Sequence, residues 1–98
     1  MTYEVRVRAR ARRDIQDAAS WYASQQPELG GEFLDEVRDS FGRISENPKS
    51  FPEMHRQTRR ALVARFPFCV FYRITGNVIT VVAVMHSSRD PNNWKSRI

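Results

Sequence analysis

Cysteine, lysine and long apolar runs are scarce in this sequence, and each shortage argues against a class of protein. The single cysteine, Cys69, permits no internal disulfide and no cysteine-based metal site, so we expect a reducing cytoplasm as the location. No apolar run approaches the ~20 residues that span a bilayer. Residues 1–13 alternate arginine with small or apolar side chains, unlike a secretory signal. We therefore expect neither a membrane protein nor a disulfide-rich secreted one.

Charged residues, in contrast, are abundant and unevenly distributed. Residues 28–46 hold six acidic side chains against two arginines, whereas residues 49–98 hold nine basic side chains against two acidic ones. Only two of the sixteen cations are lysine, and arginine binds a phosphate or carboxylate through two parallel hydrogen bonds. An arginine-rich genome would also raise the proportion of arginine over lysine, so this proportion alone does not indicate a phosphate or carboxylate partner. The net charge of +5 thus describes a basic body joined to one acidic helix.

In the first half of the chain, the apolar side chains change from a period of two to a helical period. Residues 3–9 alternate apolar and charged side chains, which predicts a strand with one buried and one cationic face. From Ala11 to about Gln26 the spacing is that of an amphipathic helix, which Pro27 should end. Gly30-Gly31 permits a sharp reversal. A second helix, antiparallel to the first, follows with an apolar stripe formed by Phe33, Leu34, Val37, Phe41 and Ile44.

The second half of the chain has the patterns of a loop and three strands. Residues 47–58 contain two prolines and no period, which indicates a loop. Residues 59–66 resume an extended pattern that Pro67 ends or confines to an edge. Residues 68–74 and 78–85 are apolar, β-branched runs joined by the hairpin signal Gly76-Asn77. The polar tail could hold a short turn near residues 93–97.

The predicted order is therefore β-α-α-β-β-β. This is an α+β fold, in which a helical hairpin covers one face of a small, mainly antiparallel sheet. With 98 residues and 41% hydrophobic side chains, the chain has material for one core, so we expect a single domain over residues 1–98.

Five stretches of sequence carry a resemblance to a known family. They are ARRDIQDAASWY on the first helix, PELGGEFLDEV, ISENPKSFPEM, RRALVARFPFCVFYRI through the hairpin, and VVAVMHSSRDPNNW near the end. In this order they resemble the RelE/ParE superfamily of toxins from bacterial type II toxin–antitoxin systems over essentially the whole chain. The RRALV, FPF and FYRI segments are more similar to the ParE branch than to the RelE branch.

The resemblance implies partners and a choice of activities. Family members are neutralised by a cognate antitoxin, whose C-terminal segment folds on the toxin. ParE-like members poison DNA gyrase, and RelE-like members cut messenger RNA inside the ribosome. The leading hypothesis is a non-enzymatic, gyrase-binding toxin, and the alternative is a ribosome-dependent endoribonuclease. A third hypothesis is a domain that has lost its activity and only binds its partner.

The residues available for RNA cleavage do not form a complete set. Metal-free cleavage needs a general base, cations for the phosphate and a general acid. His86 closes the last strand, and Arg60 and Arg73 could supply cations, but no tyrosine follows Tyr72 to act as the acid. We therefore expect no catalytic site, and we interpret His86 as a structural histidine that hydrogen-bonds the following turn. The two histidines also lack metal-site spacing, so we expect no metal and no cofactor.

The candidate contacts with an antitoxin or target are arginines. Arg73 lies in an otherwise apolar strand, where an unpaired charge is costly. We expect it to pair with a carboxylate, or else to reach a rim where it can serve a target. Trp94 is expected to fold back onto the sheet. The antitoxin segment should be acidic, partly apolar and disordered when free, and should cover the helical hairpin and the arginine-rich strands. The full set of predicted contacts is Arg6, Arg8, Arg10, Arg60, Arg65, Arg73 and Arg89.

Overall fold

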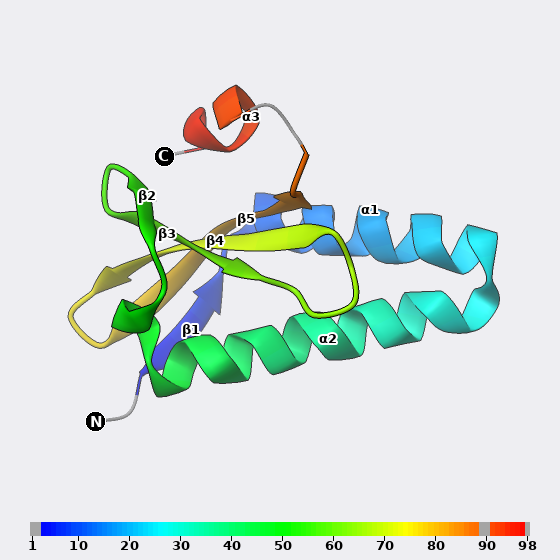
Figure 1. The fold of residues 1–98 in the computed structure, drawn as a ribbon, viewed down its shortest axis with the longest axis horizontal. Coiled ribbons are helices and arrows are strands. Elements are labelled where there is room, and N and C mark those ends of the chain that lie inside the picture. The colour runs from blue at the N-terminus through cyan, green and yellow to red at the C-terminus, as the bar shows by residue number, and fades with distance from the viewer. Residues whose placement is uncertain (1–2, 89–90, 98) are drawn as a thin grey trace.

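The computed structural model describes residues 3–88 and 91–97, and these form an α+β fold (Figure 1). The five strands form one sheet in the order β1-β5-β4-β3-β2. β1 is parallel to β5, and the other neighbouring strands are antiparallel, so the predicted fold class is confirmed. The elements are β1 (Glu4–Val7), α1 (Ala9–Gln25), α2 (Pro27–Glu46), a 3-10 turn η1 (Pro48–Ser50), β2 (Glu53–His55), β3 (Thr58–Leu62), β4 (Phe68–Thr75), β5 (Val78–His86) and α3 (Pro91–Lys95).

The two faces of the sheet have different covers. On one face, β-branched and aromatic side chains such as Val70, Tyr72 and Val84 pack against α1 and α2, which lie side by side as Figure 1 shows. On the opposite face, Trp94 of α3 is 7% exposed and stacks on Phe71, with ring centroids 4.7 Å apart. The expectation that Trp94 folds back onto the sheet is thus confirmed.

The reversal between α1 and α2 lies earlier than the sequence suggested. Gln26 alone links the helices, in an extended conformation (φ −158°, ψ 119°), and Pro27 begins α2 instead of only ending α1. Proline suits the first helical position because it needs no intrahelical donor there. Gly30 lies inside α2, where a Cβ atom would come 2.9 Å from the Ala19 carbonyl oxygen. The prediction of a reversal at the glycines was wrong, since Gly30 instead permits close helix packing.

Three other predicted boundaries also need correction. The first strand ends at Val7 and α1 begins at Ala9, two residues before the predicted start. The predicted loop 47–58 contains η1 and β2, because Arg56 and Gln57 adopt positive φ (48° and 64°) and close a hairpin without glycine. β3 ends at Leu62 instead of continuing to residue 66. The hairpin at Gly76 is confirmed, with φ at 60°.

A buried tyrosine fixes η1 against the sheet. The Tyr72 side chain is fully buried, and its hydroxyl donates a hydrogen bond of 2.6 Å to the Pro48 carbonyl oxygen. Burial raises the pKa of Tyr72 to about 12, so the phenol stays protonated and able to donate at neutral pH. Cys69 is buried, as expected for a small apolar side chain. None of the helices in the described part of the chain is long and apolar enough to cross a membrane.

Candidate functional site: an arginine face and a groove

Three of the predicted contact residues share the sheet face that points away from α1 and α2. Arg6 lies between Val5 and Val7, and Arg73 between Tyr72 and Ile74, all of which pack in the helix-covered core. Ala61, next to Arg60, packs there too, so alternation places Arg6, Arg60 and Arg73 on the other face. Arg6 pairs with Thr80, and Thr80 pairs with Arg73, which places the two arginines in one row across three strands, about 10 Å apart. Arg60 of β3 lies opposite Phe71 of β4, which makes Arg60 a diagonal neighbour of Arg73. We call these three residues the arginine face.

Arg73 is half-buried and has no ion pair within residues 3–88 and 91–97. The carboxylate partner that we expected for it is therefore not among the described residues. Arg6 forms an exposed ion pair with Glu4. An exposed pair contributes little to stability and can exchange for another carboxylate or phosphate. The arginine face thus keeps cationic groups available to an anionic partner.

The remaining predicted arginines lie elsewhere. Arg8 and Arg10 are exposed around the start of α1, and Arg89 lies outside the described residues. Arg65, in the β3–β4 turn, pairs with Glu32 at 2.7 Å and Glu36 at 3.3 Å on α2. These hydrogen bonds raise the pKa of Arg65. Because Glu32 and Glu36 are like charges one helical turn apart, Arg65 relieves their repulsion, so it serves the fold on the helix side of the molecule.

His86 does not meet the arginine face. It pairs with Phe68 at one end of β4, whereas Arg73 lies five residues further along β4, which at ~3.3 Å per residue is about 17 Å away. The His86 ring packs 5.4 Å from Phe68, and its Nδ1 accepts a hydrogen bond of 3.1 Å from the Ser88 N–H. The expected hydrogen bond between His86 and the following turn is therefore present. The set required for RelE-type cleavage, His86 with Arg60 and Arg73, is not brought together.

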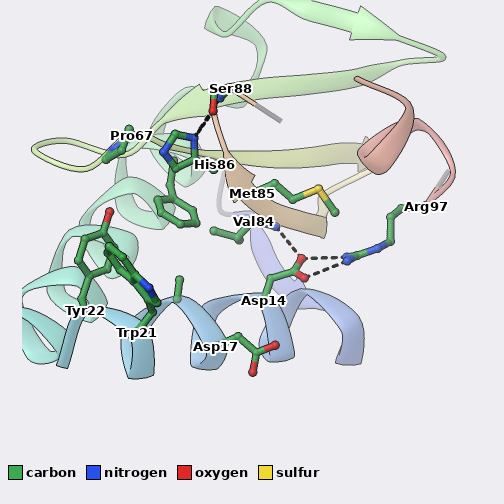
Figure 2. Close-up of a pocket in the computed structure, with 12 residues that line it drawn as sticks. Asp14, Asp17, Trp21, Tyr22, Pro67, Val84, Met85, His86, Ser88 and Arg97 are labelled. Atoms are coloured by element: carbon green, nitrogen blue, oxygen red, sulfur yellow. Dashed lines mark hydrogen bonds and ion pairs between the residues drawn. The ribbon is translucent and has the colours of Figure 1, made fainter. Parts of the chain in front are cut away.

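Sequence reasoning missed a groove of about 900 Å³ between α1 and the C-terminal half of β5 (Figure 2). β1 has only four residues against nine in β5, so no strand within residues 3–88 and 91–97 pairs with the outer edge of β5 beyond Val81. Trp21 lines the groove and is 59% exposed. The lining residues are Asp14, Asp17, Ala18, Trp21, Tyr22, Pro67, Phe68, Val84, Met85, His86, Ser88 and Arg97. We call this feature the α1–β5 groove.

One end of the α1–β5 groove is closed by a two-point ion pair. The Arg97 guanidinium donates to both Asp14 carboxylate oxygens, at 2.8 and 2.9 Å, and the side chains are 10% and 16% exposed (Figure 2). Asp14 also accepts from the Val84 N–H at 3.0 Å, and Arg97 donates to the Val82 carbonyl oxygen at 3.2 Å. The hydrogen bonds that Arg97 donates to Asp14 raise the pKa of Arg97. The pair therefore caps edge groups of β5 and fastens the C-terminal segment to α1.

Known proteins resemble this chain in both sequence and fold. The model of the ParE toxin of type II toxin–antitoxin systems (parDE) matches residues 5–91. Toxin ParE2 of Mycobacterium tuberculosis is 30% identical over 102 aligned positions, covering 100% of this chain and 94% of that protein. The chain belongs to the ParE toxin family.

Solved structures agree with the fold of this ParE-family chain. A chain of the chromosomal ParDE system from P. aeruginosa superposes with a TM-score of 0.77 at 15% identity, covering 87% of this chain and 96% of that one. E. coli toxin RelE superposes with a TM-score of 0.63 at 14% identity, covering 99% and 94%. The family match ends at Pro91, so the Arg97 end of the ion pair lies beyond the matched residues.

Across residues 3–88 and 91–97, no group of three His, Cys, Asp or Glu side chains is placed to hold a metal ion. The arginine face carries cations, and the α1–β5 groove is lined by aromatic side chains beside the edge of β5.

Proposed function

We propose that this ParE-family protein is the toxin of a type II toxin–antitoxin pair, that it acts by binding and poisoning DNA gyrase, and that a cognate antitoxin neutralises it. The observation that carries the proposal is the separation of His86 from the arginine face. A nuclease that used these groups would need them around one phosphate, and about 17 Å along β4 is too far for that. A binding toxin needs no such convergence.

The arginine face gives the antitoxin proposal its chemistry. A disordered acidic segment associates quickly with a cationic surface and can follow several elements at once. Arg60 and Arg73 are adjacent, partly exposed and without ion pairs in the part of the chain that the structure describes, so they can receive carboxylates without first breaking a bond. We place the protein in the cytoplasm, where gyrase and a co-produced antitoxin would be found.

Induction of the toxin in growing bacteria, with and without its neighbouring small gene, tests the proposal. We expect growth arrest by the toxin alone and rescue by the antitoxin. Messenger RNA ends mapped within minutes of induction should show no new codon-linked cuts. Prompt cuts that disappear in His86→Ala would establish the RelE-type endoribonuclease instead, and growth unaffected by the intact protein would leave a domain without toxic activity.

A further inference from the structure

The sheet face that carries the arginines has a row of hydrogen-bond donors without partners. Arg6 and Arg73 lie on either side of Thr80, and the register of β3 with β4 places Thr58 across from Arg73. Among the described residues, the buried Thr58 hydroxyl has no hydrogen-bond partner and Arg73 has no ion pair. Buried hydroxyls and half-buried charges are normally satisfied, so this row points to a bound anion.

The spacing and residue types of the row fit a line of phosphates. Guanidinium and hydroxyl groups are among the side chains that contact the phosphates of DNA. Arg6 and Arg73 are about 10 Å apart, which is the axial rise of about three successive phosphates in one strand of a duplex. Arg60 adds a third cation as the diagonal neighbour of Arg73. Arg6 pairs with Glu4, but this pair is exposed, so a phosphate can replace the carboxylate at little cost.

The aromatic side chains on this face are not available to nucleic acid bases. Phe71 and Trp94 are 4% and 7% exposed, because their rings stack on one another. A single-stranded nucleic acid is held largely by bases that stack on exposed aromatic rings. A duplex keeps its bases stacked inside and presents its charged backbones, which need only cations and hydroxyls. Cations beside covered rings therefore favour a duplex over a single strand.

We infer that the arginine face binds the sugar–phosphate backbone of duplex DNA, without reading its sequence. Binding of this kind needs neither gyrase nor an antitoxin, so it goes beyond the proposed function. DNA held by gyrase would concentrate the toxin beside the enzyme, since cationic surfaces are steered toward DNA. An acidic antitoxin segment would compete with the phosphates for the same arginines.

Fluorescence anisotropy of a labelled duplex of about 20 base pairs, titrated with the intact toxin, measures the contact. Three phosphate contacts predict that the logarithm of the binding constant falls with the logarithm of salt concentration with a slope of about −2.7. The double variant Arg60→Gln with Arg73→Gln should reduce the slope to about −0.9 and weaken binding at least about tenfold at about 0.05 M salt. Arg6→Gln, at a side chain that is 67% exposed, should give about −1.8 even if the double variant does not fold.

The matched control is Arg13→Gln with Arg38→Gln, which removes the same charge from exposed positions on α1 and α2. It should keep the wild-type slope and bind within about threefold of wild type, because these helices cover the opposite face of the sheet. Thermal unfolding of each free variant separates loss of binding from loss of fold.

Four results would overturn the inference. They are no binding to the duplex at about 0.05 M salt, equal losses in the arginine-face and control variants, a single strand of the same length bound more tightly than the duplex, and a peptide of about ten glutamates bound more tightly than the duplex. The second would mean attraction to net charge alone, the third base stacking, and the fourth an acidic protein partner. None of these measurements uses gyrase or the antitoxin, so their failure is distinguishable from failure of the proposed function.

Discussion

Replacing Arg97 with alanine should lower the free energy of unfolding by about 2–3 kcal/mol. The substitution removes two charge-assisted hydrogen bonds to Asp14 and one to the Val82 carbonyl. Breaking a fully buried ion pair costs about 3–5 kcal/mol because the remaining charge is stranded. Here the Asp14 side chain is 16% exposed and keeps its bond to the Val84 N–H, so the cost falls below that range. For a domain of this size the melting temperature should drop by about 10–20 °C.

Urea unfolding followed by circular dichroism measures this loss. Arg38→Ala is the matched control, because its pair with Asp35 is 3.7 Å long and its side chains are 80% and 73% exposed. We expect less than about 0.5 kcal/mol there. A double-mutant cycle with Asp14→Ala should give a coupling of at least about 1 kcal/mol. An Arg97→Ala protein as stable as Arg38→Ala would refute the reasoning that this pair fastens the C-terminal segment.

Three further predictions follow from the packing and charge. Gly30→Ala should destabilise the protein by about 1–3 kcal/mol in urea unfolding, because its Cβ would overlap α1, whereas Gly42→Ala, with open space around it, should stabilise by up to about 1 kcal/mol. Tyr72 has a folded-state pKa of about 12 against 10.0 when free, so the stability from its protonated form is complete below pH 10.0 and is lost as pH rises toward 12. The difference in free energy of unfolding between wild type and Tyr72→Phe should therefore narrow by about 2 kcal/mol between pH 10.0 and 12. A difference that stays constant over this range would contradict the prediction. The double variant Arg60→Glu with Arg73→Glu should weaken antitoxin binding clearly and flatten its salt dependence in calorimetry, and unchanged affinity would show that the arginine face is not a contact.

Local patterns in the sequence were sufficient to predict the fold class. Alternation and β-branched runs identified β4 and β5, and Gly76 marked their turn because its positive φ is unfavourable for other residues. The hairpin at Arg56-Gln57 gave no such signal, because two ordinary residues adopt positive φ there, so β2 was predicted as loop. The helical reversal was misplaced because glycine serves close packing as well as turns.

The Asp14–Arg97 pair and the α1–β5 groove could not be predicted from the sequence pattern. Asp14 and Arg97 are separated by 83 positions, and neither stands in a motif that indicates a partner. The α1–β5 groove arises because β1 is shorter than β5, which becomes visible only when the two strands are in register. The position of Arg6 on the cationic face of its strand was predictable, because apolar and charged side chains alternate along residues 3–9. The distance of His86 from Arg73 required the pairing of β4 with β5.

Supercoiling of relaxed plasmid by purified DNA gyrase is the most direct test of the proposed activity. With ATP present, we expect the purified toxin to inhibit supercoiling in proportion to its concentration. We expect His86→Ala to inhibit equally well, because we propose that His86 only holds the following turn through its hydrogen bond from Ser88. Addition of the antitoxin should restore supercoiling. Full supercoiling in the presence of excess folded toxin that still arrests growth in cells would contradict the account and require another target.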